Sequence, residues 1–418
     1  MNVRIITIGD EILSGQTLNT NAAFIGNCLS DLQLDVQKIT VVGDEREDIL
    51  KEFESALLEN DIALISGGLG PTHDDITKKC LVDFFETELV MNQEVLTDIK
   101  EFFKQRKRRV SKVNEDQALV PKKAKVIRNS KGTAPGLWIE KNKKIFIAMP
   151  GVPHELQEMM ESSVVPMLKE IIPEKTKLKK IVTLLTTGIP ESVLYERLGK
   201  LDELLKGAKL AFLPDQFGVK MRLTINGDNE EEVNNRLTGI EQKIRSLVGR
   251  YIYGKDNDKI EEIVAKLLIE RGLKIAVAES CTGGLISSRL TNISGSSAYF
   301  ERGLITYSNG SKVELLHVSE DIIQEHGSVS IEVARQMAEG VRATSGTDIG
   351  LAATGIMGPT GATFQKSVGI VYVGLADEKI CTAKEFHFRE DRLLNKDRTA
   401  QAVLDMLRRH LLGIPYDE

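Results

Sequence analysis

Across the first 170 residues, short apolar runs alternate with segments in which apolar residues recur at helical spacing. Residues 3–8, 36–42 and 62–65 form apolar runs typical of strands, and residues 22–32 and 46–59 have the period of amphipathic helices. This alternation predicts a mostly parallel sheet with right-handed crossovers and helices on both faces. Ligands of such sheets bind at the carboxyl ends of the strands, so we expect a site in the loops that follow them.

A different pattern covers residues 171–256. After a Lys-rich stretch, strand-like runs lie at 181–186 and 219–225, and helical periods lie at 191–205 and 230–248. This α+β unit is similar to a KH module, but its sequence has no Gly-x-x-Gly loop, the element with which such modules clamp a nucleic-acid backbone. A structural or dimerising role is therefore predicted for it.

Strands and helices alternate again after a polar linker at 254–258. Strand-like runs lie at 275–278, 303–307, 349–354 and 368–375, and helical segments start near 260 and lie at 284–292, 333–345 and 397–412. We therefore predict an α/β protein in which two three-layer α/β domains, at residues 1–170 and 257–418, are joined by a small α+β KH-like domain at residues 171–256.

Composition and charge narrow the class of protein. The 418 residues include 55 basic and 61 acidic side chains, a balance that argues against a nucleic-acid binder held by a broad positive field. The densest basic run, Arg106-Lys107-Arg108-Arg109, is interpreted as a solvated helix face, with contact to a phosphate or partner as the alternative. No apolar run reaches the ~18 residues of a membrane span, and the four cysteines are far apart, which favours reduced thiols and a cytoplasmic location.

A glycine-rich loop follows the apolar run at 62–65. Gly67, Gly68 and Gly70 let backbone amides approach an anion closely, and the helix that follows adds the positive end of its dipole. Asp74 and Asp75 in the same loop are hard oxygen donors suited to a divalent cation. The loop therefore predicts a phosphate cradle with a metal. The alternative is that Asp74 caps a helix and the glycines only shape a turn.

Nearby motifs extend or limit this interpretation. The acidic turn Gly9-Asp10-Glu11 ends the first strand and is expected at the same edge of the sheet, and Asn19-Thr20-Asn21 can cap the next helix. The sequence has neither a dinucleotide-binding Gly-x-Gly-x-x-Gly nor a Walker-type Gly-x-x-x-x-Gly-Lys, so neither a Rossmann nor a P-loop assignment is supported.

A second candidate site is the turn Glu279-Ser280-Cys281-Thr282-Gly283-Gly284, which follows the run at 275–278. Such a turn can expose a nucleophile at the start of a helix. A serine is activated by a neutral lysine whose pKa falls on desolvation, and Ser280 with Lys312 is such a pair. The alternative is that Ser280 is a helix N-cap and Lys312 a surface charge. Cys281 stays open as a rival nucleophile.

The first 170 residues resemble the N-terminal half of the CinA family of competence/damage-inducible proteins. The matching residues are 9–13, 19–21, the loop 67–77, Gly132-Thr133-Ala134-Pro135-Gly136, and Pro150-Gly151-Val152-Pro153 with Glu155. The resemblance implies a molybdopterin-binding fold and metal-dependent hydrolysis of ADP-ribose to AMP and ribose 5-phosphate. It implies that a divalent metal is held by Asp74, Asp75 and Asp10, and phosphate or nucleotide by Gly68, Gly70, Thr72 and Asn21.

Residues 259–412 resemble the CinA C-terminal domain, in the stretches 278–284, 295–300, 307–309 with 312, 326–330, 354–359, and 391–392 with 398. The resemblance implies deamidation of nicotinamide mononucleotide to nicotinate mononucleotide and ammonia, without a cofactor. Ser280 would attack, Lys312 would act as base and Tyr307 would assist. The substrate or its oxyanion would be held by Thr282, Gly283, Ser297, Thr354 and Gly355, and its phosphate by Arg392 and Arg398.

Two departures from the family pattern and two rival functions complete these expectations. Family members usually have a basic residue at the position of Asp116, and a proline at that of Ser367, where proline presets φ. Weaker phosphate binding and a freer loop are expected. The rival functions are a molybdopterin-binding protein and a non-catalytic factor in DNA uptake or repair. The resemblance also implies a homodimer whose partners are small nucleotides, with neither membrane nor direct nucleic-acid contact.

Overall fold

The computed structural model describes residues 1–72, 75–172, 178–389 and 391–415. The chain divides into two compact units, residues 1–175 and 176–418, whereas the sequence pattern placed the first boundary at residue 170. Each unit is described by itself. Among the described residues, no helix combines the length and apolar character needed to cross a bilayer.

A six-stranded sheet forms the centre of the first unit, and its strand order is β2-β1-β3-β8-β7-β6. The first four strands run parallel, and the last two antiparallel. The strands are β1 (Asn2–Ile8), β2 (Asp35–Val42), β3 (Ile62–Ser66), β6 (Lys125–Ile127), β7 (Gly136–Lys141) and β8 (Lys144–Met149). The parallel core follows from the strand–helix alternation, which the structure confirms.

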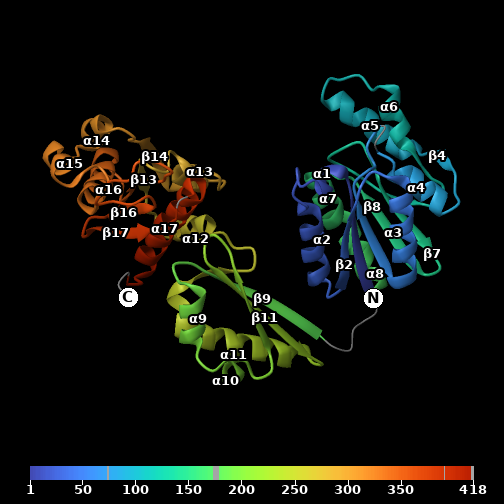
Figure 1. The fold of residues 1–418 in the computed structure, drawn as a ribbon, viewed down its shortest axis with the longest axis horizontal. Coiled ribbons are helices and arrows are strands. Elements are labelled where there is room, and N and C mark those ends of the chain that lie inside the picture. The colour runs from blue at the N-terminus through green and yellow to red at the C-terminus, as the bar shows by residue number, and fades with distance from the viewer. Residues whose placement is uncertain (73–74, 173–177, 390, 416–418) are drawn as a thin grey trace. The chain divides into compact units, whose positions relative to one another are not determined.

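Helices cover both faces of this sheet (Figure 1). An apolar cluster on one face packs α2 (Thr20–Asp31), α7 (Pro153–Met159) and α8 (Val165–Ile171) onto the strands. A second cluster on the opposite face packs α3 (Arg46–Glu59) and α4 (Thr77–Phe84). Trp138, the one tryptophan of the chain, is buried in the first cluster. Helix α2 begins at Thr20 because the side chain of Asn19 accepts the N–H of Ala22.

An excursion between β3 and β6 was not predicted from the sequence. It contains β4 (Leu89–Met91), α5 (Gln93–Gln105), α6 (Lys112–Glu115) and β5 (Leu119–Pro121). The basic run 106–109 is exposed, but it lies beyond the end of α5 rather than on a helix face. The Arg106 guanidinium lies 3.5 Å from the centre of the Phe102 ring, and Lys107 adopts φ 54° just after the helix end.

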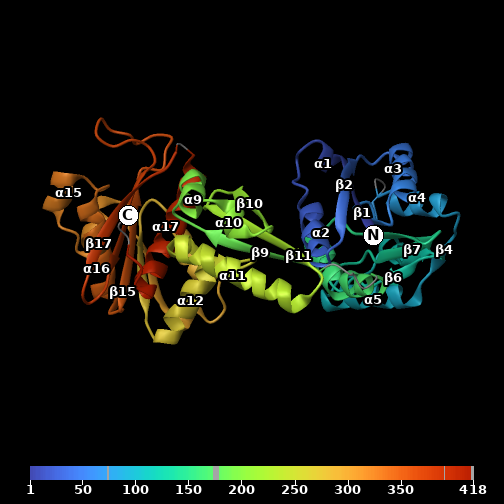
Figure 2. The same ribbon diagram turned by 90° about the horizontal axis from the view of Figure 1, so that it is seen from below.

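The second unit begins with a four-stranded sheet of order β10-β11-β9-β12. All its pairings are antiparallel. The strands are β9 (Leu178–Thr186), β10 (Lys209–Pro214), β11 (Val219–Gly227) and β12 (Ile252–Lys255), and one face packs against α9 (Glu191–Leu198), α10 (Leu201–Leu205) and α11 (Glu230–Val248) (Figure 2). The single helix expected at 191–205 is two helices, because Gly199 leaves helical geometry with φ 69°.

A five-stranded sheet of order β14-β13-β15-β16-β17 forms the C-terminal domain. β14 (Phe300–Ile305), β13 (Ile275–Glu279) and β15 (Ile349–Gly355) are parallel, and β16 (Ile370–Ala376) and β17 (Cys381–His387) are antiparallel. One face carries α12 (Ile260–Arg271), α13 (Leu285–Thr291) and α17 (Arg392–Leu412), and the other α14 (Asn309–Leu316), α15 (Glu320–His326) and α16 (Ile331–Ser345). The predicted fold class is confirmed.

Helix α17 also joins the two sheets of the second unit. Arg408, 2% exposed, donates to the backbone carbonyls of Arg250 (2.9 Å) and Ile252 (3.4 Å) at the start of β12. Arg398 Nε donates to the carbonyl of Gln216 in the turn between β10 and β11 (3.2 Å). The KH-like sheet is therefore held to the C-terminal domain by side chains of one helix.

Candidate active sites

The turn after β13 is held by a buried carboxylate. Glu279 is fully buried and accepts the backbone N–H groups of Gly284 (2.9 Å), Ile286 (3.1 Å) and Ser287 (2.8 Å) as well as the Ser287 hydroxyl (2.6 Å). These are the N–H groups that the start of a helix leaves without partners, so Glu279 caps α13 and fixes the turn 280–284. Gly284 adopts φ 98°, which favours glycine.

Ser280 and Lys312 are brought together as the sequence predicted. Lys312 lies on α14 and is 1% exposed; its Nζ is 3.1 Å from Ser280 Oγ and donates to the carbonyl of Thr306 (2.8 Å). Burial disfavours the ammonium form, so the pKa of Lys312 is lowered from its usual value. Lys312 is therefore no surface charge, and a neutral amine at this position can accept the serine proton.

The neighbouring thiol faces a different environment. Cys281 is 5% exposed and belongs to the apolar cluster beneath the sheet. Burial raises the pKa of the Cys281 thiol to about 12, so almost no thiolate exists at neutral pH. The geometry therefore favours Ser280 over Cys281 as the nucleophile.

The first two helical turns of α17 place positively charged side chains near the loop 280–284. Arg392 donates to the Tyr307 hydroxyl (3.1 Å) and to the Gly358 carbonyl (2.9 Å), so two predicted residues meet there. Lys396 Nζ lies 3.5 Å from the position that a Cβ on Gly283 would take. Lys396 was missed from the sequence; its position four residues after Arg392, on the same helix face, is the signal that could have found it.

The other residues predicted for the C-terminal site differ in burial and in hydrogen bonding. Thr354 is buried and donates its hydroxyl to the Ser328 carbonyl (2.8 Å), and Thr282 is fully buried with an unpartnered hydroxyl. Gly355 packs against β16, where a Cβ would lie 2.7 Å from Val371. Ser297 is exposed.

The structure does not bring Arg398 to this group. Residues two positions apart on a helix are separated by about 200° around its axis. Arg398 therefore lies on the opposite side of α17 from Lys396 and reaches the Gln216 carbonyl instead.

At the N-terminal site, backbone conformation and close packing explain why glycines occupy the loop. Gly67 and Gly68 adopt φ 111° and 66°, and a Cβ on Gly68 would lie 2.0 Å from Thr77 Oγ1. At Gly70 a Cβ would lie 2.5 Å from Asp75 Oδ2. Gly67 and Gly68 therefore require glycine, whereas the contact at Gly70 is with the end of the Asp75 side chain. The loop lines a cavity of about 530 Å³ together with Glu11, Asp75 and Glu155.

Several other predicted residues of the N-terminal site already form hydrogen bonds within the protein. Asp75 Oδ2 accepts the backbone N–H (2.9 Å) and hydroxyl (2.5 Å) of Thr72. Asn21 donates to Ser66 Oγ (2.9 Å) and the Gly151 carbonyl (2.7 Å), and its buried Oδ1 has no partner. Asp10 Oδ1 accepts the N–H of Asp44 (3.3 Å). Asp74 lies outside the described residues.

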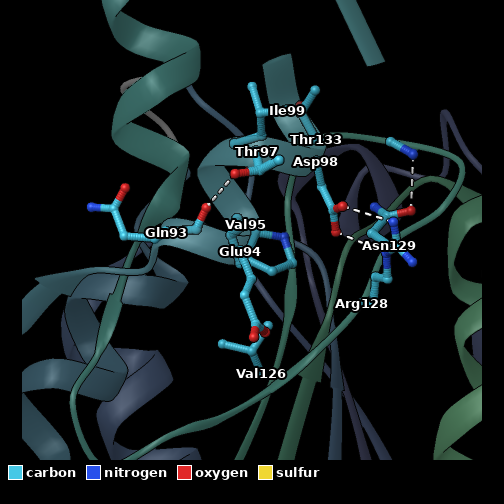
Figure 3. A pocket seen from close by; sticks show the side chains of 12 residues that line it. Gln93, Glu94, Val95, Thr97, Asp98, Ile99, Val126, Arg128, Asn129 and Thr133 are labelled. Carbon is cyan, nitrogen blue, oxygen red and sulfur yellow. Dashed lines mark hydrogen bonds and ion pairs between the residues drawn. The ribbon is translucent and has the colours of Figure 1, made fainter. Parts of the chain in front are cut away.

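A second cavity, of about 490 Å³, adjoins the loop cavity, because Thr133 lines both. Figure 3 shows its wall, where Arg128 and Asp98 form a two-fold ion pair (2.8 and 2.7 Å). Asn129 links the cavities: its amide donates to Glu155 Oε2 (2.7 Å), and its Oδ1 accepts the N–H of Gly132 (2.9 Å). Glu155 is thereby oriented toward the glycine loop by residues that the sequence analysis did not assign.

Lys78 is a further residue that was missed. Its amine donates to the Gln117 carbonyl (3.2 Å), and burial lowers its pKa to about 8, although Asp75 and Asp116 favour the charged form. Lys78 therefore places a cation next to Asp116, the position where the family pattern has a basic residue. Only its place in the helix after the loop could have suggested this role.

The described residues do not by themselves complete a metal site. Among them, no three His, Cys, Asp or Glu side chains are close enough together to hold an ion. Glu11, Asp75 and Glu155 line one cavity and offer the oxygen atoms that hard divalent cations bind. The metal expected at Asp10, Asp74 and Asp75 stays a prediction.

Three family models match the chain. They are described as a probable molybdopterin binding domain (residues 4–170), a damage-inducible protein CinA KH domain (182–254) and a CinA C-terminal domain (257–411). Together with the two sites they define the class, a multidomain protein that couples a molybdopterin-binding-type domain to a CinA-type domain through a KH-type connector.

Similar proteins identify the family. A putative competence-damage inducible protein from Caldicellulosiruptor saccharolyticus is 43% identical over 415 residues, which cover 99% of this chain and 100% of that protein. A CinA-like protein from Chloroherpeton thalassium is 42% identical over 417 residues, which cover 98% of this chain and 99% of that protein. A solved structure titled CinA with unknown function, from Thermoplasma acidophilum, is 37% identical, with a TM-score of 0.37 over 41% of this chain and 98% of that chain. The chain belongs to the CinA family.

Proposed function

We propose that the C-terminal domain deamidates nicotinamide mononucleotide to nicotinate mononucleotide and ammonia. The observation that carries the proposal is the buried Lys312 amine 3.1 Å from Ser280 Oγ. A desolvated, neutral amine is a base strong enough to take the proton of a serine hydroxyl. The family resemblance supplies the substrate, a carboxamide attached to a nucleotide.

The proposed reaction has two halves. Ser280 Oγ attacks the carboxamide carbon as its proton moves to Lys312 Nζ, and the resulting oxyanion is stabilised by backbone N–H groups of the turn 281–283. The C–N bond then breaks, and Lys312 returns the proton to the leaving ammonia. Water, deprotonated by the same amine, hydrolyses the acyl-serine and releases the carboxylate. The substrate phosphate is bound by Arg392 and Lys396.

The test is ammonia release from nicotinamide mononucleotide in EDTA. We expect turnover by the wild type, none by Ser280→Ala, and retained turnover by Cys281→Ala, a control at the adjacent position. Activity lost in Cys281→Ala but kept in Ser280→Ala would assign the chemistry to the thiol. A folded wild type without turnover would refute the deamidase.

For the N-terminal domain we propose hydrolysis of ADP-ribose to AMP and ribose 5-phosphate. The glycine loop offers backbone amides to the pyrophosphate, while Lys78 adds positive charge and the carboxylates Glu11 and Glu155 hold water. A bound divalent cation would neutralise charge that develops on the pyrophosphate.

The rival ligand is molybdopterin, which the description of the matching N-terminal family model favours. Trp138 fluorescence gives a melting curve for this domain alone. A rise in its midpoint with ADP-ribose and Mg²⁺ but not with molybdopterin supports the hydrolase. The opposite pattern would support the rival.

A further inference from the structure

A cavity of about 490 Å³ lies within the second unit, between the KH-like sheet and the C-terminal domain. One side consists of residues 187–190 and 216–218 of the KH-like domain, and the other of β17 and α17. Its volume is within the ~300–1,000 Å³ typical of small-molecule sites. Ser280 and Lys312 do not line it, so the cavity is separate from the deamidation site.

Aromatic rings form part of its walls. The rings of Phe386 and Phe388 are stacked, with centroids 6.0 Å apart and planes at 20°, and both are only partly buried. Phe217 lines the cavity from the KH-like side. Three partly covered rings around one small cavity offer faces on which a planar base can stack.

The cavity floor carries more positive than negative charge. Asp405 is the one acidic residue that lines it within the described chain, and its carboxylate is shared by Arg408 (2.7 Å) and Arg409 (2.7 Å). Arg409 is 5% exposed; its Nε donates to Asp405 Oδ2, and its guanidinium carbon lies 5.3 Å from the centre of the Tyr251 ring. Arg398 adds a further guanidinium. Two guanidinium groups that line one cavity favour an anion as ligand.

We propose that this cavity binds a nucleoside monophosphate. The base stacks on Phe386 and Phe388, and the phosphate accepts hydrogen bonds from Arg398 and Arg409, for which planar guanidinium groups are well suited. Because the ligand touches both the 216–218 turn and α17, its binding stabilises the joint between the two domains. The inference does not depend on either proposed activity.

The experiment uses the full-length protein with AMP, adenosine and ribose 5-phosphate as probes. Calorimetry gives affinities, and hydrogen–deuterium exchange locates the bound ligand. We expect AMP to protect residues 215–218 and 384–388, and adenosine and ribose 5-phosphate each to bind about tenfold or more weakly, because each lacks one of the two recognised groups. Phe386→Ala is expected to weaken AMP binding by a similar factor. Phe364→Ala, a control at a fully exposed phenylalanine, is expected to leave it unchanged.

The result that would overturn the proposal is equally specific. Protection confined to residues 67–70 or 280–284 would place AMP in the other sites, and equal binding by ribose 5-phosphate would remove the stacking role. Arg398→Gln with Arg398→Lys separates phosphate binding from folding: weakened binding that lysine partly restores supports the phosphate contact. Unchanged AMP affinity in both Phe386→Ala and Arg398→Gln would refute it.

Discussion

Replacing Lys312 by methionine tests the central pair of the C-terminal site. Methionine is a flexible apolar residue of similar length that fills the buried channel but has no basic nitrogen. A positioned general base contributes about 10²–10⁴ in rate, so we expect Lys312→Met to lower the kcat for nicotinamide mononucleotide deamidation by about that factor. The wild-type rate is expected to rise with pH through the lowered pKa of Lys312, and the variant to lack this limb.

The same substitution changes stability in a pH-dependent way. Because burial lowers the pKa of Lys312, the folded protein binds fewer protons than the unfolded chain between that lowered pKa and about 10.4. This destabilising contribution is fully present below the folded pKa and is gone above the unfolded one. Against it stands the hydrogen bond to the Thr306 carbonyl, worth about 0.5–1.5 kcal/mol. Lys312→Met is therefore expected to gain stability relative to the wild type as the pH falls.

The assay combines ammonia release, measured over a series of neutral to alkaline pH values, with denaturant unfolding followed by circular dichroism. Lys266→Met is the matched control, since Lys266 is an exposed lysine on α12 with a 3.9 Å ion pair to Glu270, worth little at a surface. A Lys312→Met protein that keeps more than about a tenth of the activity, or an unchanged pH profile, would refute the base assignment.

Four further outcomes follow from the same contacts. Cys281→Ala is expected to keep its deamidase rate while losing about 1–2 kcal/mol of stability from the core, measured by denaturant unfolding; an inactive, folded variant would contradict this. Glu279→Gln, which turns an amide toward N–H donors, is expected to cost about 2–4 kcal/mol, and an unchanged unfolding midpoint would count against the cap. Gly68→Ala places a Cβ 2.0 Å from Thr77 Oγ1. We expect it to lower the free energy of unfolding by about 1–3 kcal/mol, measured by tryptophan fluorescence, and to abolish ADP-ribose hydrolysis. Normal hydrolysis would argue against the phosphate cradle. Lys396→Met is expected to raise KM for nicotinamide mononucleotide about tenfold but not for nicotinamide riboside, which lacks the phosphate; equal effects on both would exclude a phosphate contact.

Local patterns allowed much of the fold to be predicted. The parallel strands β1, β3, β13 and β15 are short and mainly apolar, with Arg4 and Thr7 as buried polar residues of β1, because both faces of these strands are covered. The strand β17 was not predicted, since its residues are mostly exposed or half-buried and lack an apolar period. The start of α17 was placed at residue 397 instead of Arg392 because the polar run 395–398 separates its first residues and its cap, Asp391, from the apolar stripe.

The site was predictable where sequence neighbours carry the chemistry. Ser280 lies in a turn that its small and polar residues indicate, and three glycines indicate the loop at 67–70. Burial was not predictable: the low exposure of Lys312 and the core position of Cys281 arise from packing between elements far apart in the chain. The positions of Lys78 beside Gln117 and of Lys396 beside Gly283 arise from packing between elements far apart in the chain, which no local period encodes.

Helix α17 also governs when the C-terminal domain can fold. Its residues Ala400, Val403, Leu404 and Leu407 complete the apolar cluster on one face of the C-terminal sheet, yet every strand of that sheet precedes the helix in the chain. During synthesis the sheet is therefore made with this face open to water, while residues 1–175 already hold all the segments of their own core. The ribosome-bound chain passes through an aggregation-prone interval that ends only when α17 docks, and a nonsense codon before residue 392 makes that interval permanent.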